Sequence, residues 1–172
     1  MRPFALILFL ALSAPLCAEP AAPQSGPEVV SLQVGVFCAL QAMDQRPAPG
    51  TLSGWIHVPD GEIDFHWPDR QVVPAQIGLA FGVKSRLAPG LFLSGEMRVF
   101  RPGRTEPETW ESSFTDLGDQ FGFFRFDRED ELLPGIWRFE AWAGEKRLYS
   151  VDFEVVPAAA LPEIAQACGA VS

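Results

Sequence analysis

The stretch from Leu132 to Val156 constrains the fold most, because it contains two runs of alternating residues joined by a glycine-containing turn. After Pro134-Gly135, the first run places Trp137, Phe139 and Ala141 on one face and polar or mixed residues on the other. The second run alternates in the same way from Leu148 to Val155. This period of two predicts two half-buried strands. Since an isolated two-stranded hairpin is unstable in water, its apolar face must cover a second sheet.

Matching of faces selects the register of this hairpin, because a slip of one residue turns a whole strand over. A two-residue loop at Gly144-Glu145 would place Trp137 opposite Asp152. A three-residue loop, 144–146, instead pairs Trp137 with Phe153 and Arg138 with Asp152, and pairs of both kinds stabilise a sheet. We therefore predict the three-residue loop, with Trp142 and Leu148 on the outer face.

Shorter strand-like segments, the first three of them alternating, are separated by turn residues and fill most of the remaining chain, and no long amphipathic helix interrupts them. They are residues 29–38, 77–84, 95–101, 109–114 (an expected edge strand) and 121–126. Asp60-Gly61 is a strong signal for a tight hairpin within 54–67, which would pair Ile56 with Phe65 and His57 with Asp64. About eight strands in this arrangement predict an all-β fold. We expect an immunoglobulin- or fibronectin-like antiparallel β-sandwich over residues 29–156, with that hairpin inserted and a short helix from Pro162 to Cys168.

The first 18 residues have the pattern of a secretory signal peptide, with Arg2 before an apolar run from Phe4 to Leu12 that is too short to span a bilayer. Cleavage after Ala18 would leave a Pro-rich, polar segment, 19–28, which we expect to be a flexible leader. No later segment is apolar enough for a transmembrane anchor, so the predicted location is the periplasm or the exterior. Loss of Arg2 would leave 12 basic against 22 acidic residues, a net charge of −10, which disfavours nucleic acid as a partner.

Two of the three cysteines would remain after signal cleavage, because Cys17 lies in the signal. Cys38 and Cys168 form an even pair in an oxidising compartment, which predicts a disulfide that ties back the tail, residues 157–172. The alternative is a metal-binding or redox thiol, but the chain has no Cys-x-x-Cys motif.

Two segments resemble an uncharacterised family of secreted bacterial proteins, domain of unknown function family 3859. They are FGVKSRL (81–87) and ELLPGIWRFEAWAGEKRLYSVDFEVV (131–156), and the resemblance extends over Val29 to Val156. Its most specific part is the Leu-x-Pro-Gly-x-Trp turn before the hairpin. The resemblance implies no activity and transfers no site residue.

Catalytic and nucleotide-binding motifs are absent from the sequence, including Gly-x-Ser-x-Gly, the phosphate-binding loop, Gly-x-Gly-x-x-Gly and His-Glu-x-x-His. We therefore expect an exported, non-enzymatic module without a cofactor that binds a protein, an envelope component or a small ligand. An exposed tryptophan often marks a recognition surface, so the candidate contacts are Trp142 with Leu148, and Trp55 on the predicted inserted hairpin.

The alternative function uses the polar face of the predicted inserted hairpin, where His57, Glu62, Asp64 and His66 would lie together. Two imidazoles with neighbouring carboxylates could hold Zn²⁺ or Cu²⁺, in a metal-binding or metal-dependent hydrolytic protein. The simpler interpretation of the same residues is a solvated strand face with a pH-sensitive ion pair between His57 and Asp64.

Overall fold

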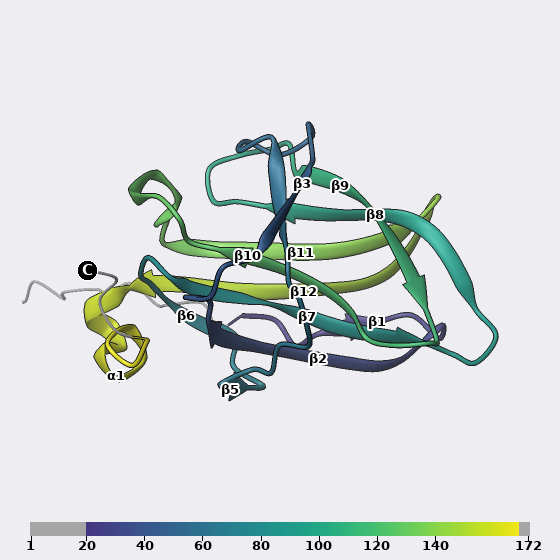
Figure 1. Ribbon diagram of the computed structural model, residues 1–172, viewed down its shortest axis with the longest axis horizontal. Coiled ribbons are helices and arrows are strands. Elements are labelled where there is room, and N and C mark those ends of the chain that lie inside the picture. Colours follow the sequence, from purple (N-terminus) through teal and green to yellow (C-terminus); the bar gives the residue numbers. More distant parts are fainter. Residues whose placement is uncertain (1–19, 169–172) are drawn as a thin grey trace, which may run out of the picture.

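The computed structural model describes residues 20–168 as two antiparallel sheets packed face to face (Figure 1). The first sheet, sheet A, is formed in the order β1 (Gln24–Ser25), β12 (Lys146–Pro157), β11 (Gly135–Ala143), β8 (Phe92–Phe100) and β9 (Glu108–Thr115). The second, sheet B, is formed by β10 (Gln120–Arg125), β7 (Leu79–Leu87), β2 (Val29–Cys38) and β5 (Trp67–Pro68). This arrangement confirms the predicted immunoglobulin-like β-sandwich.

Smaller elements complete the structure. The strand β6 (Val72–Ala75) pairs in parallel with β12, and β3 (Asp44–Pro47) and β4 (Trp55–Val58) form a separate two-stranded hairpin. Two 3₁₀ turns, η1 (Glu129–Glu131) and η2 (Ala158–Ala160), and one helical turn, α1 (Pro162–Ala165), are the only helical elements in residues 20–168. None of these helices is long and apolar enough to cross a membrane.

The core lies between the two sheets and is rich in aromatic rings. Phe81 on the central strand β7 has its ring centroid 5.7 Å from that of Trp137, 5.5 Å from that of Phe139 and 5.1 Å from that of Phe153. All four side chains are completely buried. The alternation that predicted the β11–β12 hairpin therefore reflects burial of one face of sheet A against sheet B.

The β11–β12 register is the predicted one over most of its length. Trp137 pairs with Phe153 and Arg138 with Asp152, and Arg138 Nε donates to Asp152 Oδ1 at 2.6 Å. The turn differs from the prediction, because Ala143 pairs with Lys146 across a two-residue connection. A β-bulge beside Ala141 absorbs the extra residue of β12.

This bulge corrects the placement of Leu148. The alternation put Leu148 on the outer face, but its side chain is completely buried, and the next residue, Tyr149, is buried as well. Because the shift falls between Ala141 and Trp142, Leu148 is the residue without a partner, and the bulge turns it toward the core. Leu148 therefore belongs to the hydrophobic core and is unavailable as a recognition residue.

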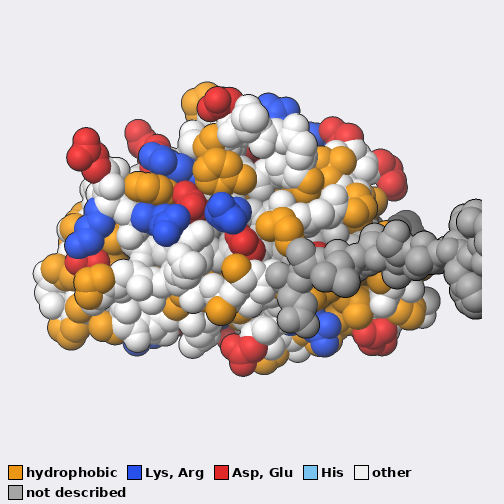
Figure 2. Space-filling model, turned by 180° about the vertical axis from the view of Figure 1, so that it is seen from behind, with side chains coloured by type: hydrophobic (Ala, Val, Ile, Leu, Met, Phe, Trp, Pro, Cys, Tyr) orange, Lys and Arg blue, Asp and Glu red, His pale blue; other side chains and the backbone are white. Residues whose placement is uncertain are grey.

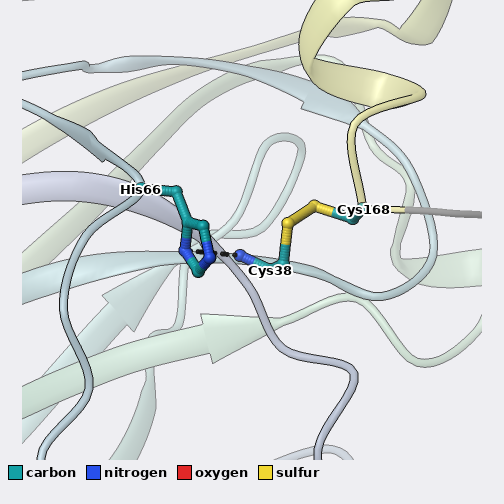
Figure 3. Close-up of a disulfide and its surroundings, with 3 residues drawn as sticks. All are labelled: Cys38, His66 and Cys168. Carbon is teal, nitrogen blue, oxygen red and sulfur yellow. Dashed lines mark hydrogen bonds between the residues drawn. A yellow bond between two sulfur atoms is a disulfide. The ribbon is translucent and has the colours of Figure 1, made fainter.

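The predicted disulfide joins the end of β2 to the C-terminal turn (Figure 3). The sulfur atoms of Cys38 and Cys168 are 2.05 Å apart and their Cα atoms 5.3 Å apart, across 130 positions of sequence. Ile164 of α1 is buried in the main core, so the tail is packed as well as covalently tied. The predicted helix is present but short, since α1 ends at Ala165.

The segment expected to be a flexible leader, 19–28, is partly a strand within its described part. Gln24 and Ser25 form β1, which pairs with Ser150 and Tyr149 of β12. Glu28 forms an ion pair with Lys146 next to this contact. No signal for β1 is visible in the sequence, because two residues are too few to show alternation. The predicted signal peptide, 1–18, lies outside the described residues.

Candidate functional site

The segment between β2 and β7, residues 39–78, positions the candidate site, and its structure corrects the predicted Asp60-Gly61 hairpin. β4 pairs with β3 and not with residues 63–67, so His57 lies opposite Gln45 and not opposite Asp64. The hairpin β3–β4 instead lies against the free edge of β9, where Arg46 Nη2 donates to the Glu111 carbonyl at 3.0 Å. In Figure 1, β3 lies beside β9 at the top of the view.

The part of the segment that contains Ile63 and Phe65 packs against the outer face of sheet B. Ile63 is buried there in a second hydrophobic cluster with Phe37 and Ala80. The Phe65 ring lies 6.2 Å from Phe37 and 5.6 Å from Phe121, measured between centroids. The face of sheet B that a simple sandwich would expose to solvent is thus partly covered.

Close packing here depends on a glycine of β2. A Cβ atom at Gly35 would lie 2.5 Å from the Phe65 ring, so any larger residue would displace the covering segment. Ala80, on the same face of β7, belongs to the same hydrophobic cluster, whereas Gly82 makes room for β10, because a Cβ atom there would lie 2.6 Å from Phe123 Cα.

A groove of about 720 Å³ remains between this covering segment and the connection from β9 to β10. We call it the sheet B groove. Lys84 and Phe121 contribute from the sheet, Ile63 and Asp64 from the covering segment, and Leu117, whose side chain is 91% exposed, lies at the connection. Its size falls within the range of about 300–1,000 Å³ that is typical of small-molecule sites.

Charges of both signs line the groove, three basic and three acidic: Arg46, Lys84 and Arg86, and Glu62, Asp64 and Asp119. Arg86 and Asp119 form an ion pair at 2.7 Å. Lys84 Nζ lies 3.4 Å from Asp64 Oδ1, but the Asp64 side chain is fully exposed whereas that of Lys84 is only 13% exposed. On the face of the molecule opposite the Figure 1 view, Lys and Arg side chains are likewise interspersed with acidic and hydrophobic ones (Figure 2).

A charged cluster lies beneath the hairpin around His57, which also lines the sheet B groove. His57 Nε2 is 2.7 Å from Asp127 Oδ2, and the His57 side chain is only 8% exposed. Arg125 Nε donates to the other Asp127 oxygen at 2.6 Å. The contact between His57 and Asp127 attaches β4 to the residues just after β10, across 70 positions of sequence.

Two further buried charges extend the cluster. Arg101 and Glu108 form an ion pair, and the Arg101 guanidinium stacks 4.6 Å from the Phe124 ring centroid. Glu108 also accepts a 2.9 Å hydrogen bond from the Leu52 amide of the hairpin loop. A cavity of about 40 Å³ lies between these groups, and His57 Nδ1, at its edge, has no hydrogen-bond partner among residues 20–168. That space is enough for a water molecule or two, which would satisfy His57.

The contacts of Asp127 with His57 and Arg125 predict how the stability of the fold changes with pH. Burial raises the pKa of Asp127, but the hydrogen bonds and charges of His57 and Arg125 outweigh it, so the pKa falls below its ordinary value of 3.8. A depressed pKa stabilises the fold above the ordinary value, and this contribution is lost as the pH falls through the lowered one. We expect Asp127→Asn to cost about 1–3 kcal/mol at neutral pH, because it removes the negative charge that lies beside Arg125 and His57.

The measurement is urea unfolding of the protein and of Asp127→Asn between neutral pH and about pH 3. The difference in free energy of unfolding between the protein and Asp127→Asn should be present above pH 3.8 and should shrink as the pH falls below that value. Asp130 is the matched control, because its pKa is also lowered, by Arg128, but its side chain is 71% exposed. Equal effects of Asp130→Asn and Asp127→Asn would show that burial of the His57 contact contributes nothing.

The structure separates the residues of the predicted metal site. His57 faces Asp127, Asp64 projects into solvent, and His66 Nδ1 accepts a hydrogen bond from the Cys38 amide at 3.4 Å beside the disulfide (Figure 3). Within residues 20–168, no three His, Cys, Asp or Glu side chains are grouped to hold a metal ion. The geometry therefore does not favour a metal centre built from His57, Asp64 and His66.

The candidate recognition tryptophans are half-buried and engaged. Trp142 Nε1 donates to Glu140 at 2.8 Å, and the Arg98 guanidinium lies 4.5 Å from the Trp142 ring centroid. Trp55 contacts the His57 ring edge-on at 4.5 Å and lines the small cavity. Trp142 and Trp55 thus lie at different places on the molecule, and each already packs against neighbouring side chains.

Comparison with known proteins adds little to this description. No family model and no curated protein matches the chain. Among solved structures, it is similar to an immunoglobulin-like protein from Pseudomonas aeruginosa, with 16% sequence identity, a TM-score of 0.44, and coverage of 81% of this chain and 100% of the other.

Proposed function

We propose that this protein is an exported, non-enzymatic binding module and that its ligand occupies the sheet B groove. The observation that carries the proposal is the groove itself, a concave surface of about 720 Å³ with a half-buried lysine above aromatic rings. Strands of a sandwich are used for the core, so function is expected on loops, edges and added segments.

The inserted segment supports this assignment, because it does more than connect two strands. Residues 39–78 form a hairpin on one side of the groove and a packed wall on the other, with Phe65 held against Gly35. Neither feature is needed to close the main core, which lies on the opposite face of sheet B. Groove residues include aromatic and charged side chains, the combination that gives both affinity and orientation in ligand sites.

The proposal includes export of the protein from the cell and its relation to an uncharacterised family of secreted bacterial proteins. The Cys38–Cys168 disulfide supports an oxidising compartment, and the pattern of residues 1–18 supports secretion. The resemblance to domain of unknown function family 3859 supports a bacterial secreted protein. The partner is a protein, an envelope component or a small ligand, and the net charge of −10 expected after signal cleavage disfavours nucleic acid.

A groove-blocking substitution tests the proposal. Gly118 lies at the groove, has no positive φ, and a Cβ there would meet nothing within 4 Å, so Gly118→Trp should fold normally and obstruct the groove. The immobilised protein and the variant are incubated with an extract of the producing cell's envelope, and bound proteins and small molecules are identified by mass spectrometry.

We expect a ligand that the unmodified protein retains and Gly118→Trp does not. Thr105→Trp is the control, since Thr105 is exposed and lies in the loop between β8 and β9, outside the groove. A ligand retained equally by both variants would place binding elsewhere on the molecule.

A further inference from the structure

Lys84 is largely buried in the sheet B groove, but its charge is poorly neutralised by neighbouring acidic side chains. Its side chain is 13% exposed, and its Nζ lies 5.5 Å from the Phe65 ring centroid and 5.7 Å from that of Phe121. Aromatic faces offset part of the loss of hydration of an ammonium group. Among the described carboxylates, only that of Asp64 forms an ion pair with Lys84, with Oδ1 at 3.4 Å from Nζ, and so offsets part of the remaining cost of burying the ammonium group.

Asp64 is a weak partner for this purpose. Its side chain is fully exposed, so the contact is solvent-screened, and exposed ion pairs contribute little to stability. The hydrated Asp64 carboxylate also loses little when another anion takes its place beside Lys84. Glu62 is exposed as well, and Asp119 is already paired with Arg86 at 2.7 Å. The acidic residues of the groove therefore do not exclude an anionic ligand.

The arrangement of the sheet places further suitable groups beside Lys84. Its cross-strand neighbours are Gln33 on β2 and Phe121 on β10, and Arg86, two residues further along β7, lies on the same face. The Arg86 side chain is 47% exposed, so it can meet a second ligand oxygen. Phe121 and Trp110 line the same groove and offer an apolar surface next to the cations.

We propose that the groove binds a carboxylate that carries an adjacent aromatic or aliphatic group, with the carboxylate on Lys84 Nζ and the apolar group against Phe121. This inference rests on the proposed function, because it names the chemical class of ligand for the same groove. The carboxylate would replace Asp64 as the partner of a largely buried ammonium, and a hydrogen bond between charged groups in such a place is strong.

The test uses 3-phenylpropionate, with 3-phenylpropionamide and acetate as matched compounds that remove the charge and the apolar group. Binding to the ¹⁵N-labelled protein is followed by NMR titration of the backbone amides. We expect 3-phenylpropionate to shift amides of β7, β10 and residues 61–65, and both matched compounds to bind at least about tenfold more weakly.

Lys84→Met and Lys84→Arg complete the test. Methionine keeps the apolar contact with both rings but removes the charge, and it should weaken binding of 3-phenylpropionate by about tenfold to a hundredfold, whereas arginine should retain most of it. Equal binding of the acid and the amide, or a Lys84→Met variant that binds unchanged, would overturn the carboxylate assignment and leave the groove as a site for neutral ligands. Absence of groove shifts with 3-phenylpropionate would also overturn it, and the Gly118→Trp capture experiment would then decide the proposed function separately.

Discussion

Replacement of Trp137 by alanine should be among the most damaging single substitutions in this protein, costing about 3–5 kcal/mol of the free energy of unfolding. The side chain is completely buried, with ring centroids of Phe124 at 4.9 Å and Phe81 at 5.7 Å. Its Nε1 also donates to the Leu133 carbonyl at 2.9 Å, so the substitution leaves both a cavity and an unsatisfied acceptor. Urea unfolding of purified protein measures the loss.

Trp142→Ala is the matched control, five positions along the same strand. The ring is half-buried and packs on Arg98, so its removal should cost about 1 kcal/mol and leave Glu140 with its remaining donors, Arg147 and Ser150. Losses of similar size at the two positions would contradict the assignment of Trp137 to the core face and Trp142 to the outer face.

Loss of the disulfide should have the second large effect. The Cys38–Cys168 bond closes a loop across 130 positions of sequence, for which the chain-entropy model gives up to about 5 kcal/mol, and native disulfides typically contribute about 2–5 kcal/mol. We expect the Cys38→Ser, Cys168→Ser double variant to unfold at a lower temperature with an unchanged strand content, because Ile164 still packs in the core. Thermal unfolding followed by circular dichroism measures both quantities.

Alkylation and intact mass provide the control for this result. The unmodified protein should gain no alkyl groups on Cys38 or Cys168 until it is reduced, and two groups afterwards. Reduction of the unmodified protein should then lower its melting temperature to that of the double variant. Two free thiols in protein isolated under oxidising conditions would contradict the disulfide.

The elements that could be predicted from the sequence are those in which buried and exposed side chains alternate with a period of two. The β11–β12 hairpin and the strand β7 alternate strongly, and, apart from Leu148 at the bulge, their faces follow from that alternation. The disulfide was also predictable, because only two cysteines follow the predicted signal peptide. These features need no knowledge of contacts between distant segments.

The predicted Asp60-Gly61 hairpin was wrong, because tertiary burial outweighed local turn chemistry. Residues Ile63 and Phe65 gain a position beside Phe37 on the outer face of sheet B, which a hairpin with β4 would not provide. The strand β4 then pairs with β3, whose sequence contains Pro47 and shows no alternation. The same rearrangement separates His57 from Asp64, so the geometry does not favour the predicted metal site.

The candidate site could not be read from the sequence, because its parts come from segments that only the fold brings together. Lys84 and Arg86 were visible as polar residues of a strand, but nothing in the spacing placed them opposite Asp64 or Asp119. The His57–Asp127 contact spans 70 positions and has no local signal. A weak indication existed in the glycine at position 35, since a strand glycine often marks close approach of another segment.

The most direct test of the central claim, that the ligand occupies the sheet B groove, is site-specific photo-crosslinking in the producing cells. A photoreactive phenylalanine analogue replaces Leu117, which is 91% exposed at the groove, or Trp142 on the outer face of sheet A. After illumination, mass spectrometry of the purified protein detects any covalently attached species. We predict attachment at position 117 and none at position 142, whereas attachment at position 142 alone would contradict the assignment of the groove as the binding site.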